Sequence, residues 1–589
     1  MKHRLLQFFC ALVLLAPLGA QQNPPPPAAS PSVQIPSPPA SADARAQNAP
    51  APDSSRRGFG IAGIVVNAST GEPIASAAVA IARVTHGADR DISNSIITGP
   101  DGRFSFTRLS QGKYSLMAQA HGFSLQAFER HDDYSSAIVV GPEQDSEHLV
   151  FRLQPDAALD GQVTDENNDP VQFAMVRLFP TRSGADGMMR MAPSEQTQTD
   201  DQGHYHLGHV LPGAYYLAVS ARPWYAQNVP PTISAGNGDE PHTPPYPSGQ
   251  LDSALDVTYP LTFYPDATDS ADASPLQLAP GAHETANIVL RAVPGLHLRI
   301  HTGESAAQRP VIGRMIFPRV YQRILGGYLD SVYNAPDSWV APGVIEISGL
   351  APGHYVIEIP PSTGAGEKAG SRGAYRELDL NGDAEISVGD GPGFANVSGT
   401  ILFEGSTVPK GASIQLINRD TGEIFRSDIN RRGEFELASD AIRPARYLVA
   451  LGNAPGFYLK KLAATGARIV GRAMEVGGGT VRLAMIAAAG EAEVDGVALH
   501  DDAPFAGAMI VLVPQDAANN TPLFRRDQSD SDGSFTLANV VPGQYTVIAI
   551  ASGWDLDWSN PAVLQPYLKR GEAVQVPPEG KLQVKIQVQ

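Results

Sequence analysis

The fold of this chain is decided by residues 532–545, whose sequence is DGSFTLANVVPGQY. The stretch opens with Asp-Gly, a pair that suits a tight turn because glycine tolerates positive φ. Phe535 and Leu537 then alternate with small or polar residues, the pattern of a half-buried strand. After a Pro-Gly turn, Tyr545 begins a second alternating run. The stretch therefore predicts two strands joined by a short turn.

The same pattern occurs five times along the chain. In each copy an aromatic residue or Ile follows the first turn, and a Tyr follows the second. The tyrosines are about one hundred residues apart, which is a domain length rather than a solenoid repeat length. We therefore predict five tandem domains, and we expect each Tyr to be structural, buried with its hydroxyl reaching the backbone. The pairs are Phe104 and Tyr114, Tyr205 and Tyr215, Ile345 and Tyr355, Phe435 and Tyr447, and Phe535 and Tyr545.

The N-terminal region has the composition of a targeting signal followed by a linker. Lys2 and Arg4 precede an apolar run that ends in small residues, so residues 1–20 are predicted to be a signal peptide. The Pro- and Ala-rich residues 21–57 predict a disordered linker. No long helical period follows, and the five domains are predicted to be β-sandwiches, the second with insertions and the third divergent. They are expected at 58–155, 156–292, 293–391, 392–489 and 490–589.

The order of short motifs in the first predicted domain resembles the carboxypeptidase regulatory-like domain family. The resemblance covers the first, second and fifth domains well, the fourth partly and the third least. It implies an all-β, transthyretin-like and Ig-like sandwich of seven strands, related to starch-binding-like modules. In the related enzymes this sandwich is an accessory beside the catalytic domain. The matching motifs in the first domain are Gly63–Val65, Thr70–Ile74, Ala77–Val79, Asp101–Phe104 and Gly112–Tyr114.

The net charge and the cysteine content indicate which kinds of partner and which cellular compartment to expect. The net charge of −18 argues against a nucleic-acid partner, which requires clustered Lys and Arg. The single cysteine, Cys10, lies in the predicted signal peptide, so the exported chain is expected to fold without disulfides. No later segment has eighteen uncharged apolar residues, and we expect no transmembrane helix. The chain is predicted to be exported and to reside in the periplasm, on the outer surface or outside the cell.

Catalysis is not expected. His301 and Glu304 have the spacing of the zinc pair of metallocarboxypeptidases, but the catalytic fold behind that motif alternates strands with long helices, and this sequence does not. An accessory subunit of a peptidase is the more distant alternative. No cofactor is expected.

Two groups of residues imitate metal sites, and we predict that neither binds a metal. His204, His206 and His209 share a predicted strand, where the first two would lie on one face, but the simpler interpretation is a water-facing polar face. The acidic run that begins at Asp379 imitates a calcium loop, but Ala384 occupies the position that requires Gly. A hairpin turning at Asn381-Gly382 is preferred.

Four aromatic residues are candidates for binding carbohydrate: Trp558, Trp554, Trp224 and Tyr225. Aromatic rings stack on the flat apolar face of a sugar, and the alternative for each is ordinary packing. Trp558 is the first choice because its loop has no equivalent in the first domain. We therefore predict an exported, non-catalytic binding or adhesion protein with a polysaccharide or an envelope protein as partner. A structural spacer of the cell envelope is the alternative.

Overall fold

The computed structural model describes most of the chain after residue 57. The predicted signal peptide and linker lie outside the described residues, as do Glu304 and most of the two predicted insertions of the second domain, about 181–199 and 226–258. The described ranges are 58–84, 94–131, 134–142, 144–181, 193–228, 251–301, 318–332, 335–341, 343–359, 374–387, 393–437, 442–490, 492–518, 520–558 and 560–589.

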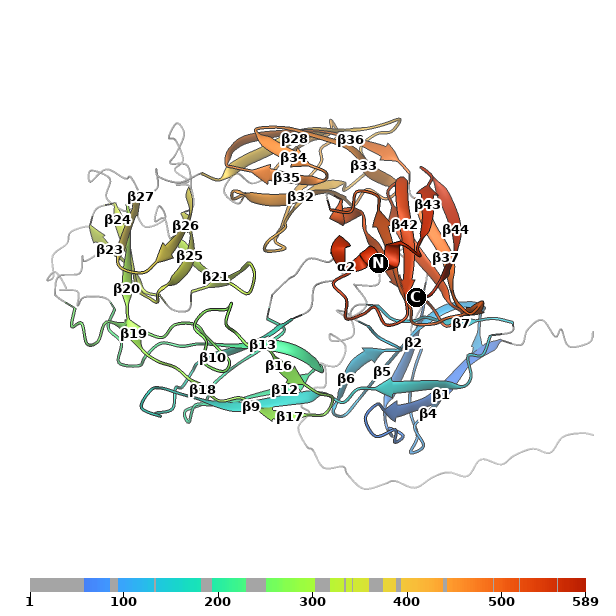
Figure 1. The fold of residues 1–589 in the computed structure, drawn as a ribbon, viewed down its shortest axis with the longest axis horizontal. Helices are drawn as coiled ribbons and strands as arrows, with labels where there is room; N and C mark the ends of the chain where they lie inside the picture. The colour runs from blue at the N-terminus through green and yellow to red at the C-terminus, as the bar shows by residue number, and fades with distance from the viewer. Residues whose placement is uncertain are drawn as a thin grey trace, which may run out of the picture.

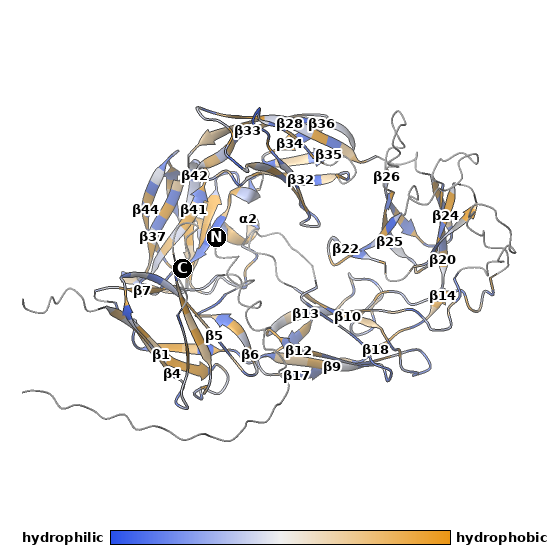
Figure 2. Ribbon diagram, turned by 180° about the vertical axis from the view of Figure 1, so that it is seen from behind, coloured by the Kyte–Doolittle hydropathy of each residue, from blue (hydrophilic) through white to orange (hydrophobic). Residues whose placement is uncertain are grey.

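The described residues form five pairs of β-sheets, which we call sandwiches 1 to 5 in chain order (Figure 1). This confirms the all-β fold. Each pair encloses a hydrophobic core built from both of its sheets. Side chains alternate between core and solvent along most strands, and Figure 2 shows this alternation as hydrophobic and hydrophilic bands along β37 (Ala492–His500) and β44 (Gly580–Gln587).

Sandwich 1 has sheets β4-β1-β8 and β3-β2-β5-β6, with β7 also paired to β5. Its strands are β1 (Phe59–Asn67), β2 (Ala78–Arg83), β3 (Asn94–Ile97), β4 (Arg103–Leu109), β5 (Gly112–Ala120), β6 (Phe123–Ala127), β7 (Ile138–Val140) and β8 (Leu149–Leu153). Sandwich 2 has sheets β12-β9-β17, with β18 also on β9, and β11-β10-β13-β15, with β16 also on β13. Its strands are β9 (Ala157–Thr164), β10 (Met175–Pro180), β11 (Glu195–Gln198), β12 (His204–Val210), β13 (Gly213–Ser220), β15 (Thr262–Phe263), β16 (Leu276–Leu278), β17 (His283–Thr285) and β18 (Ile288–Val289). A two-stranded ribbon of β14 (Val257–Thr258) and β19 (Val293–Pro294) follows.

Sandwich 3 has sheets β23-β24-β20-β27 and β22-β21-β25-β26. Its strands are β20 (Leu296–His301), β21 (Arg319–Ile324), β22 (Tyr328–Ser331), β23 (Asp337–Ala341), β24 (Val344–Leu350), β25 (Gly353–Ile359), β26 (Ala374–Leu380) and β27 (Ala384–Ser387). Sandwich 4 has sheets β31-β28-β36-β33 and β30-β29-β32-β35-β34. Its strands are β28 (Ala395–Phe403), β29 (Ser413–Asn418), β30 (Ile424–Asp428), β31 (Glu434–Glu436), β32 (Ala445–Gly452), β33 (Phe457–Thr465), β34 (Ala467–Val470), β35 (Ala473–Val476) and β36 (Gly479–Ala489).

Sandwich 5 has sheets β38-β37-β41, with β44 also on β37, and β40-β39-β42-β43. Its remaining strands are β38 (Ala503–Pro504), β39 (Met509–Pro514), β40 (Arg525–Gln528), β41 (Ser534–Val540), β42 (Gly543–Ile550) and β43 (Glu572–Val576). A 3-10 turn, η4 (Thr521–Leu523), precedes β40, and a short helix, α2 (Pro561–Leu568), precedes β43. Asn560 begins α2 because its side chain accepts a hydrogen bond from Ala562 N. None of the described helices is long and apolar enough to cross a membrane.

One pairing pattern is shared by all five sandwiches. The first strand pairs antiparallel with the strand that follows the first turn of the repeat, and parallel with a strand near the end of the sandwich. In sandwich 5 these partners of β37 are β41 and β44. The equivalent first strands are β1, β9, β20 and β28, each with one antiparallel and at least one parallel partner.

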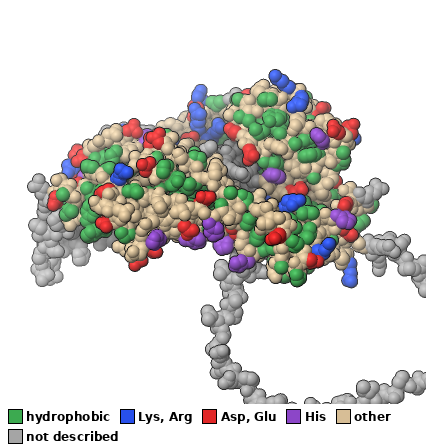
Figure 3. Space-filling model, turned by 60° about the horizontal axis from the view of Figure 1, so that its bottom comes forward, with side chains coloured by type: hydrophobic (Ala, Val, Ile, Leu, Met, Phe, Trp, Pro, Cys, Tyr) green, Lys and Arg blue, Asp and Glu red, His purple; other side chains and the backbone are tan. Residues whose placement is uncertain are grey.

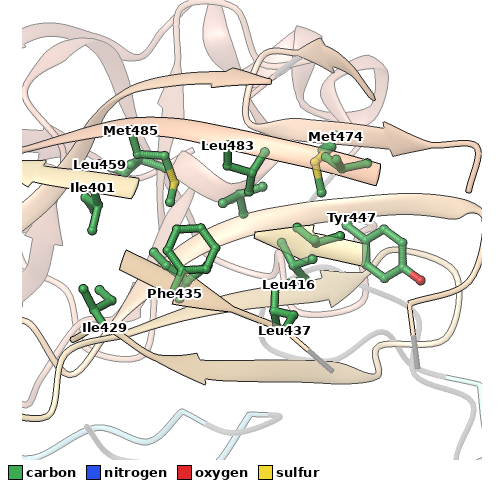
Figure 4. Packing of buried hydrophobic residues seen from close by; sticks show 14 of the residues in the cluster. Ile401, Leu416, Ile429, Phe435, Leu437, Tyr447, Leu459, Met474, Leu483 and Met485 are labelled. Atoms are coloured by element: carbon green, nitrogen blue, oxygen red, sulfur yellow. The ribbon is translucent and has the colours of Figure 1, made fainter. Parts of the chain in front are cut away.

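The tyrosine of every repeat is buried and makes the same hydrogen bond. Its hydroxyl donates to the backbone carbonyl four residues earlier, just before the second turn, and so fixes the turn to the strand that follows. Figure 4 shows Tyr447 and Phe435 in the core of sandwich 4. The bonds run from Tyr114 to Ser110 (2.9 Å), Tyr215 to Leu211 (2.7 Å), Tyr355 to Ala351 (2.7 Å), Tyr447 to Arg443 (2.9 Å) and Tyr545 to Val541 (2.7 Å).

A glycine in the first strand makes room for the aromatic ring of the repeat. Gly496 pairs with Phe535, and a Cβ on Gly496 would lie 2.3 Å from the ring atom Cζ of Phe535. The same pairing joins Gly399 to Phe435. In sandwich 3 the aromatic is replaced by Ile345, and its partner is Ile300 instead of a glycine. Sandwich 3 therefore needs no glycine at this position of its first strand, because it has no aromatic ring to accommodate there.

Candidate functional site

Trp224 and Tyr225 lie in a loop that follows β13 at one end of sandwich 2. Trp224 is 87% exposed, the most open large hydrophobic side chain of the described residues. Its ring meets that of Tyr225 edge to face, with centroids 5.7 Å apart and planes at 85°. The loop is held by two hydrogen bonds to Ala226: its N donates to Pro223 O, and its O accepts from Arg222 Nη2. The structure therefore brings two of the four candidate aromatics together on an open surface.

Carboxylates lie near this aromatic pair. Partial burial raises the pKa of Tyr225, and the negative charges of Glu166 and Asp165 raise it further. The same two carboxylates add to the burial that raises the pKa of the neighbouring Tyr259. Because a carboxylate repels an anion, this surface suits an uncharged or basic ligand.

A small hollow opens next to the loop, between sandwiches 2 and 3. Its volume is about 40 Å³, enough for water molecules but not for a sugar ring. The hollow is lined mainly by polar and aromatic residues, among them Arg222, Asn228, Tyr259, Gln322, Asp330 and Tyr355.

The other two candidate aromatics lie on sandwich 5 and are covered. Trp558 is only 6% exposed and packs with Phe524 in a second hydrophobic cluster, outside the sandwich core, to which α2 contributes Leu564. Trp554 is half-buried, and its indole Nε1 donates to Gly507 O at 3.1 Å. The first-choice residue from the sequence therefore offers no open ring face for a sugar. Sequence reasoning expected a loop here and missed α2, although Asn560-Pro561 has the pattern of a helix start, a capping side chain followed by Pro in the first turn.

The histidines of β12 each face an aspartate on the outside of sandwich 2. His206 Nδ1 lies 2.7 Å from Asp160 Oδ1, His209 Nδ1 lies 3.0 Å from Asp156 Oδ2, and His204 Nδ1 lies 3.9 Å from Asp200 Oδ2. All three histidine side chains are mostly exposed, and Figure 3 shows several histidines close together on one face of the molecule. Within the described ranges, no group of three His, Cys, Asp or Glu residues has the arrangement of a metal site.

The expected hairpin at Asn381-Gly382 is wrong. β26 and β27 flank this turn, but β26 pairs with β25 and β27 pairs with β20. The turn therefore carries the chain from one sheet of sandwich 3 to the other, because each sheet has its own hydrophobic face to complete. Asp390, the last position of the calcium-like run, lies outside the described residues.

A buried ionic cluster that sequence reasoning missed joins sandwiches 2 and 3. The His297 ring bonds Glu346 through Nδ1 at 3.0 Å and Asp256 through Nε2 at 2.8 Å. The bond to Glu346, followed by that to Asp256, raises the pKa of His297 to about 9 although burial opposes it. The partnership with His297, together with Arg299, lowers the pKa of Glu346 to about 2. No local sequence signal could reveal this cluster, because its members come from distant segments.

The family comparison agrees with the fold of sandwiches 1 and 2. The sequence model of the carboxypeptidase regulatory-like domain matches residues 60–154 and again 158–242. No curated protein sequence matches the chain. Similar solved structures include the TIE protein of Bacillus anthracis, with 13% identity, 70% of this chain and 69% of that chain covered, and a TM-score of 0.14. Another is GBS52, the minor pilin of Streptococcus agalactiae, with 12% identity, 40% and 96% covered, and a TM-score of 0.20.

The family model matches the first two sandwiches of the chain. In sandwich 1 the matched range runs from β1 to β8, and in sandwich 2 it runs from β9 past β13. It includes the loop of Trp224 and Tyr225. The chain thus carries at least two tandem domains of the carboxypeptidase regulatory-like family.

Proposed function

We propose that this chain is an exported, non-catalytic binding or adhesion protein that holds carbohydrate on the surface formed by Trp224 and Tyr225. The observation that carries the proposal is the 87% exposure of Trp224. A ring that remains in water contributes little to folding, and an exposed apolar surface commonly marks an interaction site. Stacking of a sugar ring on the indole would bury that surface on binding.

The charges around the pair narrow the ligand class. Asp165 and Glu166 lie near Tyr225, and the whole chain has a net charge of −18. An anionic polysaccharide would be repelled at this surface, especially at low ionic strength. Neutral glycans, or glycans with amino groups, are therefore the proposed ligands.

The non-catalytic part of the proposal rests on the family. Carboxypeptidase regulatory-like domains are accessory domains beside catalytic ones. In the described residues, sandwich follows sandwich without a fold that alternates strands and long helices. Binding, and not turnover of the bound glycan, is the expected activity.

A glycan-array screen of the chain, followed by titration of the best neutral glycan, tests the proposal. One stacked aromatic contributes about 1 kcal/mol, so binding through this pair alone should be weak, with Kd near the millimolar range. Trp224→Ala should weaken the binding about fivefold or more, because about 1.4 kcal/mol corresponds to a tenfold change in Kd. Leu402→Ala is the matched control, because Leu402 is 63% exposed on sandwich 4 and its removal should leave binding unchanged.

Failure of every glycan to bind would favour a structural scaffold of the cell envelope instead. Equal binding by Trp224→Ala and the unmodified chain would move any carbohydrate site away from this loop. Preference for an anionic polysaccharide would contradict the role given to Asp165 and Glu166.

A further inference from the structure

Sandwich 5 contacts sandwich 1 although almost four hundred residues separate the two contacting segments. The strand β40 and the turn after it, residues 529–531, lie against residues 129–131 and 134–139 of sandwich 1, which lead into β7. Figure 1 shows β7 beside the base of sandwich 5, and the reverse view in Figure 2 agrees. We call these two facing segments the clasp.

Gln528 is the centre of the clasp. Its side chain is 0% exposed, and it finds its hydrogen-bond partners on sandwich 1. Nε2 donates to Glu129 O at 2.6 Å and to Ser136 Oγ at 2.9 Å. Oε1 lies 3.1 Å from His131 Nδ1. Such complete pairing of a buried amide marks two surfaces that fit each other.

The turn after β40 adds backbone and charged contacts. Asp530 Oδ1 accepts from Ala137 N at 2.8 Å, and Oδ2 accepts from Lys113 Nζ at 2.6 Å. Ser531 N donates to Ala137 O at 3.0 Å, and Ser136 Oγ donates to Ser529 O at 2.9 Å. Hydrogen bonds to charged groups are stronger than neutral ones, so the buried Asp530 is stabilised by this partner surface.

Aromatic side chains complete the clasp. The guanidinium of Arg526 lies 4.7 Å from the ring centroid of Tyr134 on sandwich 1, 5.4 Å from that of Trp554 and 4.6 Å from that of Trp558. Trp554 also stacks on His131, with centroids 4.9 Å apart. These cation–π and stacking contacts explain why the two tryptophans of sandwich 5 are covered.

Sandwich 2 offers an internal comparison, because it has the same residues at the same register without such a partner. Gln198 pairs with Met175 in the way that Gln528 pairs with Met509. Gln198 is exposed, whereas Gln528 is fully buried. Two residues further on, the side chain of Asp200 is 55% exposed and that of Asp530 is 5% exposed. The motif alone therefore does not produce burial; the docking of sandwich 1 does.

We infer that the clasp holds sandwich 5 on sandwich 1 in solution and closes the chain into a ring. Each sandwich also contacts the next one, so no break interrupts the circle. A closed ring cannot reach as far as five sandwiches in a line, and this argues against a long spacer. The neighbouring contacts include Asp156 N to Gly122 O, Arg177 with Asp330, Arg443 with Glu358, and Arg419 with Thr521.

Small-angle X-ray scattering of the full chain tests the ring. Gln528→Arg places a long charged side chain in the clasp and should open it, while Gln198→Arg is the matched control at the equivalent exposed position. We expect the opened variant to gain maximum dimension by about 30 Å, one nine-residue strand length at ~3.3 Å per residue. Equal scattering from the two variants, or an extended unmodified chain, would overturn the inference.

A cross-link tests the clasp without disturbing Gln528. Val139 N donates to Ser531 Oγ at 2.9 Å, so Val139→Cys and Ser531→Cys should form an intramolecular disulfide in a chain with Cys10→Ser. Asp201→Cys in place of Ser531→Cys is the control, since it occupies the equivalent turn of sandwich 2. A fast-migrating cross-linked monomer for the first pair alone supports the ring. No cross-link, or equal cross-linking by both pairs, overturns it.

Discussion

Gly496→Ala should destabilise sandwich 5, because the added methyl group has no room. Its Cβ would lie 2.3 Å from Phe535 Cζ and 2.5 Å from Val584 O, while carbon atoms in contact prefer about 3.5–4.0 Å. The ring of Phe535 must therefore move by about 1 Å or more. The carbonyl oxygen of Val584 can move only if β44 shifts along β37. Overpacking of this kind costs about 1–3 kcal/mol, and we expect a value in the upper half of that range.

Denaturant unfolding followed by tryptophan fluorescence measures this cost. Trp554 and Trp558 are two of the four tryptophans of the chain and both belong to sandwich 5, so part of the emission change reports the unfolding of this sandwich. Gly477→Ala is the matched control, because nothing lies within 4 Å of a Cβ built there. It should leave the transition of sandwich 5 unchanged.

A second substitution tests the cause. Phe535→Leu shortens the side chain opposite Gly496, imitating the ring-free pairing of sandwich 3. In the double variant the two costs should not add, and a coupling of about 0.5–3 kcal/mol is expected for residues in contact. Rescue should be partial because the approach to Val584 O remains. Strict additivity, or a cost of Gly496→Ala below about 0.5 kcal/mol, would refute the steric account.

Three further predictions concern stability and domain organisation. Tyr545→Phe should cost about 1 kcal/mol, since it leaves the carbonyl of Val541 without its 2.7 Å partner; an unchanged unfolding midpoint would contradict the structural role of the repeat tyrosines. His297, whose pKa is raised from 6.5 to about 9, should contribute to the free energy of unfolding in full below pH 6.5, and this contribution should be lost as the pH rises through 9. The contribution of Glu346, whose pKa is lowered from 4.5 to about 2, should be complete above pH 4.5 and be lost as the pH falls through 2, so thermal unfolding should show this cluster most stabilising between pH 4.5 and 6.5. His297→Gln should remove the loss at alkaline pH and weaken the loss at acid pH, where Arg299 still pairs with Glu346. Limited proteolysis should cut first within the insertion 226–258 and then near the proposed boundaries at 156, 293, 392 and 490; a single indivisible fragment would argue against five domains.

The repeat was predictable because its signals are local. A turn that needs positive φ, an alternating strand and a tyrosine four residues beyond a carbonyl are all encoded within about fifteen residues, and each acts without distant partners. Gly533, for example, has φ of +75° in the first turn of the last repeat. The all-β fold and the family resemblance followed from such stretches taken in order.

The candidate site was only partly predictable, because the exposure of an aromatic ring depends on what packs over it. Trp224 and Trp558 are similar in their sequence surroundings, each in a loop after a long strand. One is open to solvent, while α2 and the clasp cover the region of the other. The local sequence describes the tryptophan itself and not the residues that pack over it. Sequence reasoning therefore ranked Trp558 above Trp224, although Trp224 is the more exposed of the two.

The strands, the turns and the repeat tyrosines could be inferred from the amino-acid sequence, because backbone conformation and side-chain alternation are set by neighbouring residues. Which surfaces meet depends on the folded molecule. Gln198 and Gln528 have the same residue type at the same register, yet only Gln528 is buried against sandwich 1. The contact depends on the complementarity of two surfaces that lie almost four hundred residues apart, and no local pattern specifies that complementarity.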